Sequence, residues 1–400
     1  MTDFNQKRII LGITGGIAAY KAAELTRQLI KAGAMIRVIM TEAATHFIAP
    51  ATFQALSNQP VWTDLWDTRI QNSMAHIDLS RDSDAIIVAP ASADFIAKIA
   101  HGLANDLLTT TCLARTCPLF LAPAMNRQMW EHPATQRNVS QVQNDGAVLL
   151  GPEEGEQACG ETGLGRMLEP DAIFEDLASS LSPKLLRGIK ILLTAGPTYE
   201  AIDDVRGITN SSSGKMGYEL AKACVAAGAA VTLISGPTSL EPPRHSRIIA
   251  VTSASEMHEQ VLAETSSNDI FISVAAVADY RPANQQQGKI RKSSEKMILE
   301  LVPTKDILTE VASSPNPPWC VGFAAESGDI LAKAQEKLER KHLPLIIANS
   351  TSAIKATDNE VTLIDAQSAH KLPRMDKTSL AQKIVAEIAK RYHSRNTKSD

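Results

Sequence analysis

Short apolar runs alternate with longer amphipathic stretches along this chain, and two of the runs stop at the same kind of turn. Leu119–Ala122 breaks at Pro123 before a helix predicted from Arg127, and Ala85–Ala89 breaks at Pro90 before a second helix. A continuous apolar run is typical of a strand that is buried on both faces of a parallel sheet. The pattern predicts an α/β fold whose chemistry lies in loops at the carboxyl ends of the strands.

The strand–turn–helix pattern starts twice. Arg8–Leu11 is a predicted strand followed by a glycine turn and a helix over Ile17–Gly33, and Lys190–Thr194 opens a second series. Glu169–Gly188 carries two prolines and a short helix, so it is interpreted as the end of one domain and the link to the next. Two doubly wound domains are therefore predicted, residues 1–189 and 190–400. Pro50–Leu79 is expected to be irregular.

Composition narrows the classes of function. A net charge of -4 provides no strong positive field for nucleic acid or for a membrane surface. The apolar run Ile9–Ile13 is too short for a signal peptide core or a membrane span, so a cytoplasmic location is expected. The 5 cysteines include no Cys-x-x-Cys pair, which favours reduced thiols over disulfides or a zinc site.

The first glycine turn favours a phosphate group. Gly15 and Gly16 precede a predicted helix, where backbone N–H groups can approach an anion. The spacing is not Gly-x-Gly-x-x-Gly, and the second strand ends in Met40-Thr41-Glu42 without a clear acidic residue for a ribose. A mononucleotide therefore fits better than a dinucleotide, although a single glycine turn is a weak indication.

The other strand ends in the first half carry small and amide side chains. Such residues leave room for a flat ligand and can bond its polar edge, with Met125, Met129 and Trp130 as apolar walls. The alternative is that each polar residue only caps a helix. The residues in question are Ser92, Asn105, Asp106 and Asn126.

Two further residues in the first half are candidates for proton transfer. Gly151–Met167 contains so many glycines and glutamates that a mobile flap is expected rather than a packed element. Cys159 lies in this flap, where a thiol could swing over a site, although most cysteines are buried and structural. His76 stands in His-Ile-Asp, and the ordinary interpretation of a lone histidine is a surface residue.

Charged loops follow the strand ends of the second half. Asp203–Gly217 is rich in hydrogen-bond donors but lacks the glycine spacing and the Ser/Thr of a Walker A loop. Asp279 follows a strand, and the cationic run around Lys289 comes soon after it, so a triphosphate and a magnesium ion could both be held there. The alternative is a solvated charged face. Lys333, Lys337 and Lys341 give one helix a basic face.

Together these stretches resemble the bacterial family in which phosphopantothenoylcysteine decarboxylase is fused to phosphopantothenate–cysteine ligase, two activities of coenzyme A biosynthesis. The resemblance runs from Gly12 to about Lys390. It implies a flavodoxin-like flavoprotein domain followed by a Rossmann-like ligase domain. The motifs that carry it are GGIAAYK, HIDL, APASADF, GLANDLL, PAMNRQMW and ACGE in the first half, then AGPT, VRGITNSSSGKMG, AAVADYRP, GKIRK, PTKDIL and GFAAE.

For the first half, the resemblance implies an FMN-dependent decarboxylase. The substrate thiol is oxidised to a thioaldehyde, and the neighbouring carboxylate then leaves as carbon dioxide. By resemblance His76 is the active-site histidine, Asn126 holds the substrate carboxylate, and Cys159 gives a proton when the hydride returns. The residues implied on the FMN side are Gly15, Gly16, Ile17, Thr41, Ser92, Asn105 and Met125.

For the second half, the resemblance implies a ligase that uses CTP. The carboxylate of 4'-phosphopantothenate becomes an acyl-cytidylate, pyrophosphate leaves, and the amine of cysteine forms the amide. Asn210 and Lys289 are implied as catalytic, with Asp279 as a magnesium ligand. The residues implied around CTP or the acyl-cytidylate are Arg206, Ala275, Asp279, Lys305, Asp306, Ile307, Leu308, Phe323, Lys337 and Lys341.

The resemblance also implies a homo-oligomer, a dodecamer through the N-terminal domain with dimers of the ligase domain. Small molecules are the expected partners, with no nucleic acid and no membrane. Three other interpretations compete with this one. Another cysteine-decarboxylating flavoprotein would leave residues 190–390 without a role. A non-enzymatic flavin-binding regulator would predict the loss of Cys159 or Asn126, and a two-domain dehydrogenase would need the missing glycine fingerprint.

Overall fold

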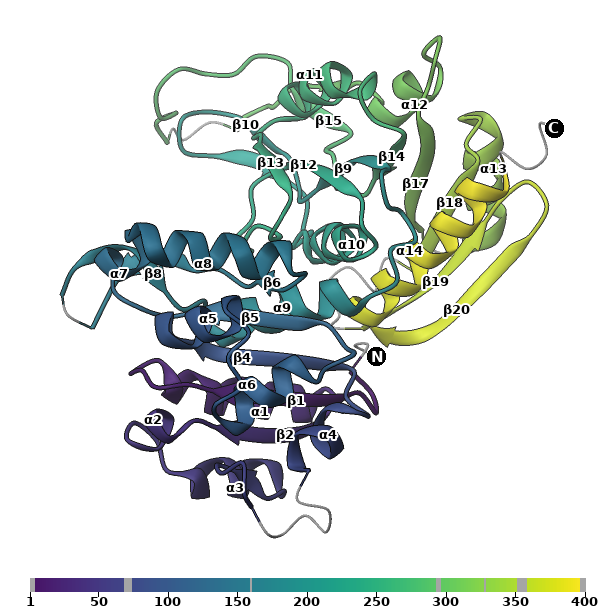
Figure 1. Ribbon diagram of the computed structural model, residues 1–400. Helices are drawn as coiled ribbons and strands as arrows, with labels where there is room; N and C mark the ends of the chain where they lie inside the picture. The colour runs from purple at the N-terminus through teal and green to yellow at the C-terminus, as the bar shows by residue number, and fades with distance from the viewer. Residues whose placement is uncertain are drawn as a thin grey trace. The chain divides into compact units, whose positions relative to one another are not determined.

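The computed structural model describes residues 4–67, 74–158, 160–292, 296–326, 329–350 and 358–395. The chain divides into two compact units, Met1–Leu181 and Ser182–Asp400. Each unit has a parallel sheet with helices packed on both faces, so the predicted α/β class is confirmed (Figure 1). No helix among the described residues is both long and apolar enough to cross a membrane.

The described part of the first unit contains a six-stranded parallel sheet in the order β3-β2-β1-β4-β5-β6. Without the edge strand β3, this is the flavodoxin order, and the chain reverses direction across the sheet between β1 and β4. The strands are β1 (Arg8–Ile13), β2 (Met35–Met40), β3 (Val61–Trp62), β4 (Ala85–Ala91), β5 (Leu119–Pro123) and β6 (Val148–Leu149).

Side chains alternate between the two faces of this sheet, as the period of a strand requires. Ile9 and Leu11 pack against helices on one face of the sheet, and Ile10 packs against helices on the other face. The helices on the face of Ile9 and Leu11 are α1 (Ala19–Lys31), α3 (Pro50–Ser57) and α9 (Pro170–Leu181). The helices on the face of Ile10 are α4 (Ala75–Ser80), α5 (Ala93–Ala100), α6 (Leu107–Leu113) and α8 (Pro133–Asn144). The short helices α2 (Glu42–Thr45) and α7 (Arg127–Glu131) follow the carboxyl ends of β2 and β5.

One expectation for the first unit was wrong, and a second left out a regular element. Pro50–Leu79 is not irregular throughout: it contains α3, β3 and α4, and Phe53 of α3 is fully buried. The glycine-rich run Gly151–Met167 forms an antiparallel hairpin of β7 (Glu153–Glu156) and β8 (Thr162–Arg166). Backbone pairing and close approach to the β5 loop stabilise this hairpin, so it needs few apolar side chains of its own.

The second unit repeats the doubly wound pattern and adds an antiparallel edge. The described strands of its main sheet follow the order β13-β12-β9-β14-β17-β18-β19-β20, with the first six parallel. The main strands are β9 (Lys190–Ala195), β12 (Ala230–Ser235), β13 (Arg247–Ala250), β14 (Ile270–Ser273), β17 (Trp319–Glu326), β18 (Leu345–Ser350), β19 (Asp358–Ile364) and β20 (Ala369–Asp376). Two small hairpins pair β10 (Tyr199–Ala201) with β11 (Gly207–Thr209), and β15 (Tyr280–Pro282) with β16 (Leu301–Pro303).

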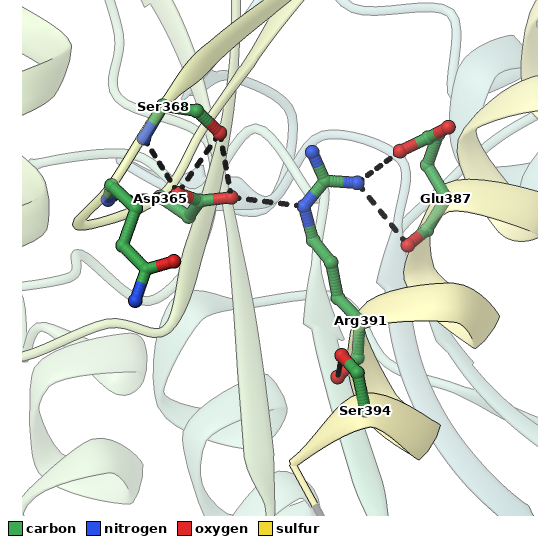
Figure 2. A network of polar contacts seen from close by, with 6 residues as sticks. Asp365, Ser368, Glu387, Arg391 and Ser394 are labelled. Atoms are coloured by element: carbon green, nitrogen blue, oxygen red, sulfur yellow. Dashed lines mark hydrogen bonds and ion pairs between the residues drawn. The ribbon is translucent and has the colours of Figure 1, made fainter. Parts of the chain in front are cut away.

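Helices cover both faces of this second sheet. One core contains residues of α10 (Lys215–Ala226) and α14 (Lys377–Ser394), and the other contains residues of α11 (Ala254–Thr265), α12 (Ile307–Ala312) and α13 (Ile330–Arg340). The sequence analysis did not foresee the β19–β20 hairpin or α14. An ion pair between Asp365 in the hairpin turn and Arg391 of α14 joins the hairpin to this helix, and Arg391 also pairs with Glu387 (Figure 2).

Candidate active sites

In the first unit, three strand-end loops are fastened to one another. The Thr14 hydroxyl after β1 donates to the carbonyl of Pro90 at 2.7 Å, and the same oxygen accepts from the N–H of Ser92 at 3.0 Å. The N–H of Ala124 after β5 donates to the carbonyl of Ala91 at 3.1 Å. The carboxyl ends of β1, β4 and β5 therefore form one rigid edge, as expected at the switch point of such a sheet.

The glycine turn after β1 leaves an open backbone surface. A Cβ on Gly15 would stand 2.7 Å from the Cβ of Ala43, so this position requires glycine, whereas a Cβ on Gly16 would meet nothing within 4 Å. Ile17 is 61% exposed. Helix α1 follows with Ala18 as its N-cap and no side-chain cap. The N–H groups of Ala19 and Lys21 donate to the carbonyls of Gly16 and Ala18, so an anion would meet the other N–H groups of this turn.

Four of the polar residues predicted in the first unit are helix N-caps, namely Thr41, Ser92, Asp106 and Asn126, and for the last three this is what the alternative interpretation held. The side-chain oxygen of Thr41 accepts from Ala44, that of Ser92 from Phe95, and that of Asn126 from Met129, at 3.3, 3.2 and 3.0 Å. Capping does not use the whole of each group, because the Ser92 hydroxyl donates to no described acceptor. The amide nitrogen of Asn126 donates to Gln128 Oε1 at 3.0 Å, at a site that solvent reaches.

The remaining residues predicted on this side lie at the same edge or next to a cap. Met125 is half-buried and packs against the core beneath α5 and α6. Asn105 is exposed and precedes Asp106, which forms a capping box with Thr109 at the start of α6. Asp106 is also within 3.6 Å of the Lys98 ammonium.

The β7–β8 hairpin is fastened to the loop of Asn126, although Cys159 itself lies outside the described residues. Gln157 Oε1 accepts from the N–H of Arg127 at 3.0 Å, and Gln157 Nε2 donates to the carbonyl of Leu164 at 3.2 Å. Gly165 passes so close that a Cβ there would stand 2.4 Å from the carbonyl oxygen of Met125. Gln157 was not singled out from the sequence, because a glutamine in a polar run carries no pattern of its own.

His76 does not lie with these groups within one copy of the chain. It belongs to α4, which precedes the amino end of β4, whereas α2 and α7 mark the opposite end of the sheet (Figure 1). Among the described residues, its buried Nδ1 atom has no hydrogen-bond partner. An unpartnered buried ring nitrogen is uncommon in folded proteins, and each instance calls for an explanation.

In the second unit, the loops after β9 and β14 meet at the switch point. The Thr194 hydroxyl accepts from the N–H of Ala275 at 3.3 Å. The Asn210 amide donates to the carbonyl of Ala276 at 2.9 Å, which brings the donor-rich loop against this strand end. The N–H of Thr304 donates to the carbonyl of Asp279 at 2.9 Å, so the backbone segments that carry the exposed residues Asp279 and Lys305 lie next to each other.

The residues of the PTKDIL motif divide between surface and core. Ile307 and Leu308 are each 5% exposed and pack in the core beneath α11 and α13, so only their backbone could meet a ligand. Asp306 caps α12 and pairs with the buried ammonium of Lys341, with Nζ 2.8 Å from Oδ1. Burial would raise the pKa of Asp306, but hydrogen bonds from Lys341 and Thr309 outweigh it and lower the pKa.

Two other residues predicted around CTP are partly accessible. Phe323 of β17 is half-buried against the core beneath α10 and α14, and Lys337 of α13 is half-buried. Among the described residues, no group of three or more His, Cys, Asp or Glu side chains is arranged to hold a metal ion.

Arg206 is held by a carboxylate that the sequence analysis did not single out. Its guanidinium lies 2.8 Å from Asp203 Oδ2 and donates to the carbonyl of Ile290 at 2.6 Å. Burial would raise the pKa of Asp203, but N–H groups of Val205, Ile290 and Arg206 and the Arg206 charge lower it to about 2. Lys289, next to Ile290, is exposed. Only the fold reveals this role, because Asp203 is one of many turn aspartates in the sequence.

Comparison with known proteins finds matches to both halves. Residues 1–182 match the family described as Flavoprotein, and residues 186–392 match the DNA/pantothenate metabolism flavoprotein C-terminal domain. The chain is 48% identical to the coenzyme A biosynthesis bifunctional protein CoaBC of Vibrio vulnificus, with 96% of this chain and 97% of that protein covered. It is 43% identical to the CoaBC protein of Escherichia coli K12, with 98% of each covered.

Solved structures also match each half. The crystal structure of the C-terminal domain of CoaBC is 38% identical, with 53% of this chain and 99% of that chain covered and a TM-score of 0.47. The FMN-dependent cysteine decarboxylase SpaF is 32% identical, with 44% of this chain and 99% of that chain covered and a TM-score of 0.39.

Proposed function

We infer the chemistry of the two units from one premise: the chain belongs to the family of coenzyme A biosynthesis bifunctional proteins. It is a bifunctional enzyme with a flavoprotein decarboxylase half and a ligase half. It catalyses two consecutive steps of coenzyme A biosynthesis. Cysteine is joined to 4'-phosphopantothenate, and the product is decarboxylated to 4'-phosphopantetheine.

The observation that carries this function is the span of the similarity. Relatives 43 to 48% identical match this chain over 96 to 98% of its length, so both halves are accounted for together. The alternative of another cysteine-decarboxylating flavoprotein concerns the first unit only, and the regulator alternative has no support. A cytoplasmic location stays a prediction.

We propose FMN as the flavin of the first unit. Two features support this choice: the open backbone at Gly16 and the start of α1 without a side-chain cap. Gly15, Gly16 and Ile17 would hold the phosphate, and Thr41, Ser92, Asn105 and Met125 would surround the rest of the cofactor. When bound, FMN supplies the oxidation of the cysteinyl thiol and the later return of the hydride.

The residues of this chain would orient the substrate and move its proton. Asn126 would hold the substrate carboxylate through a neutral amide, which orients the anion without binding it so strongly that carbon dioxide cannot leave. Cys159 would donate the proton that completes the product, and the fastening of its hairpin to the Asn126 loop supports this pairing. His76 would complete the site.

The position of His76 supports a site built from two copies of the chain. Within one copy, α4 lies at the opposite end of the sheet from the loop of Asn126. A symmetric assembly can bring the α4 of one copy to the strand ends of another. The proposed assembly is a homo-oligomer through the first unit, a dodecamer by family resemblance, with dimers of the ligase unit.

A mixing experiment tests the shared site. The variants His76→Asn and Asn126→Asp should each lose decarboxylation, and co-expression of the two should restore part of it, because mixed assemblies contain some sites with both native residues. If each site lay within one copy, every site of the mixture would lack one residue. No activity would then return.

For the ligase unit we propose CTP as the activating nucleotide, with magnesium. Attack of the 4'-phosphopantothenate carboxylate on the α-phosphate would release pyrophosphate and form an acyl-cytidylate. The cysteine amine would then form the amide bond, with CMP as the leaving group and a proton lost from the amine. Asp279 would hold the magnesium ion, which would supply positive charge against the triphosphate; a single carboxylate would suffice, since this ion takes few protein ligands beside phosphates.

The proposed ligase residues follow the charge of these species. Lys289, Lys305 and Lys337 would neutralise the phosphates, Lys341 would lie beside CTP with its ammonium paired to Asp306, and Arg206 and Asn210 would contact the acyl-cytidylate. Ala275 and Phe323 would contact CTP, and Asp306 would act through its pair with Lys341. Ile307 and Leu308 could contribute only backbone groups, because their side chains lie in the core.

Two assays on the purified chain test these assignments. The visible spectrum, followed by release and identification of the pigment, should show FMN, and a colourless protein that cannot be reconstituted with FMN would refute the cofactor. Pyrophosphate release with 4'-phosphopantothenate should require CTP and magnesium, and equal rates with ATP would refute the nucleotide. Lys289→Ala should slow this release and leave decarboxylation intact.

Alkylation gives an independent test of Cys159. Burial raises the pKa values of Cys112, Cys224 and Cys320 to about 12, and it also raises the pKa of the half-buried Cys117, so these four thiols should react slowly at neutral pH, and Cys117→Ser serves as the control. Treatment of the native enzyme with iodoacetamide should therefore abolish decarboxylation through Cys159, and 4'-phosphopantothenoylcysteine should protect against it. Ligase activity should persist. Full decarboxylation after complete labelling of Cys159 would refute its role.

A further inference from the structure

The segment around Lys289 is tied to the residues that follow β10. The N–H of Ile290 donates to Asp203 Oδ2 at 3.0 Å, and the N–H of Gly288 donates to Asp204 Oδ2 at 3.0 Å. These two residues stand on either side of Lys289 in the chain. The backbone is therefore fixed immediately before and after Lys289, while the lysine side chain is exposed.

Asp203 is the centre of this attachment. Its side chain is fully buried, and both of its oxygens accept hydrogen bonds. Oδ1 accepts from the N–H of Val205 at 2.8 Å and of Arg206 at 2.7 Å. Oδ2 accepts from Ile290 and from the Arg206 guanidinium. The same guanidinium donates to the carbonyl of Ile290, so the segment is held through both its N–H and its C=O.

The donors around Asp203 require a carboxylate. An asparagine has one acceptor oxygen, and its NH₂ group would face N–H donors whichever way the amide is turned. Charge-assisted hydrogen bonds are also stronger than neutral ones. An Asp203→Asn substitution should therefore release one side of the attachment with almost no change in the volume of the side chain.

We propose that Asp203 is a positioning residue of the ligase reaction: it fixes the Lys289 segment and the Arg206 guanidinium, and so presents both cations to the negatively charged substrate. This inference rests on the proposed role of Lys289. Asp203 touches no substrate and acts through its neighbours. Without Asp203 the Lys289 side chain would no longer be held in the orientation that the transition state needs, and kcat would fall. A misplacement of about an ångström can lower a rate by about 10²-fold.

The test uses the full-length enzyme and a matched control. Asp365 offers the same kind of environment, with N–H donors from Gln367 and Ser368 and a guanidinium from Arg391 (Figure 2). It lies in the β19–β20 turn and has no part in the proposed site. Asp203→Asn should lower the kcat of CTP-dependent pyrophosphate release about 10- to 100-fold. Asp365→Asn should leave this kcat within about 2-fold, and decarboxylation by the same samples serves as the internal standard.

A double-mutant cycle separates positioning from a general loss of structure. In a Lys289→Ala background, Asp203→Asn should cause a clearly smaller loss of kcat than in the native background, because only the part that acts through Arg206 remains and residues that act as a unit are not additive. Hydrogen exchange should also accelerate at the amides of Gly288 and Ile290 in Asp203→Asn, and stay unchanged in Asp365→Asn. Equal losses of kcat in both backgrounds would overturn the inference.

A second variant covers the case in which Asp203→Asn does not fold. Asp204 is exposed, so Asp204→Ala removes the attachment of Gly288 without opening a buried void. It should lower kcat several-fold, again only when Lys289 is present, and a wild-type kcat with faster exchange at Gly288 would overturn the inference. If Lys289→Ala alone keeps the native ligase rate, the proposed role of Lys289 fails. Equal kcat losses for Asp203→Asn in the two backgrounds are a different outcome, because they keep the proposed role of Lys289 and reject only the role of Asp203.

Discussion

Substitution of Gly16 by alanine can separate binding of the cofactor from stability of the fold. The backbone at Gly16 is not in the left-handed region, so an alanine can adopt it. A Cβ there would meet no protein atom within 4 Å, whereas at Gly15 it would stand 2.7 Å from Ala43. Gly16→Ala should therefore leave the cofactor-free fold within about 0.5 kcal/mol of native stability. Gly15→Ala should destabilise it by about 1–3 kcal/mol through overpacking.

The expected loss in binding follows from the contacts of the phosphate. If the added methyl group displaces the phosphate from one backbone N–H, about 1.5–3 kcal/mol of charge-assisted hydrogen bonding is lost. That energy corresponds to a Kd roughly 10- to 150-fold weaker. With FMN at 100 times the native Kd, ligand binding stabilises the native protein by about 2.7 kcal/mol. A 100-fold weaker variant would gain only about 0.4 kcal/mol at the same concentration.

The assay is thermal unfolding with and without FMN, together with titration of the apoprotein by flavin fluorescence. The shift of Tm on addition of FMN should be about 5–9 °C smaller in Gly16→Ala than in the native chain, from the difference of about 2.3 kcal/mol and the usual scaling for a unit of this size. Gly15→Ala should instead lower the Tm of the apoprotein. A Gly16→Ala variant with native Kd would refute the placement of the phosphate at this turn.

Three further predictions concern other parts of the molecule. Asn126→Asp should keep the cap of α7, so the free energy of unfolding should stay within about 0.5 kcal/mol of native. The rate of decarboxylation should fall at least about 100-fold, because the new carboxylate would face the carboxylate of the substrate, and native activity would exclude contact between residue 126 and that group. Burial would raise the pKa of Asp365, but hydrogen bonds and Arg391 lower it below 3.8, so this stabilisation is complete above that pH and is lost as the pH falls. Arg391→Leu should therefore flatten the acid end of the stability profile measured by urea unfolding, and an unchanged slope would contradict this. Asp306→Asn should destabilise the ligase unit by about 1–3 kcal/mol, because it removes the negative charge opposite the buried Lys341 ammonium. Adding Lys341→Met should restore part of that stability, and additive losses of the two substitutions in urea unfolding would argue against the pair.

The strands of the parallel sheets could be predicted because their burial leaves a local mark. Residues of a strand buried on both faces are almost all apolar, so β4 and β5 stand out as runs that end at proline. The start of α7 could also be predicted, since Asn126 is the type of residue that caps a helix. These features depend on the residues themselves and on their immediate neighbours in the chain.

Elements stabilised by distant partners left no such mark. The β7–β8 hairpin is rich in glycine and glutamate, and its stability comes from backbone pairing and from Gln157, which reaches the loop after β5. The segment before β4 reads as irregular, yet Phe53 of α3 is buried against the sheet. Local propensity is too weak to reveal elements of this kind, because tertiary packing provides most of their stability.

The candidate sites divide in the same way. By itself the sequence determined which residue types stand at the strand ends, and the motif letters determined the family and hence the two reactions. Only the tertiary structure decided which of these residues meet: Asn126 with the hairpin, Asn210 with Ala276, and Asp306 with Lys341. It also separated His76 from the other candidates and made Asp203 the anchor of the Lys289 segment. These contacts join residues 30 to 87 positions apart. They depend on how the strands are ordered in the sheet, and that order is set by packing of the whole core rather than by any local stretch of sequence.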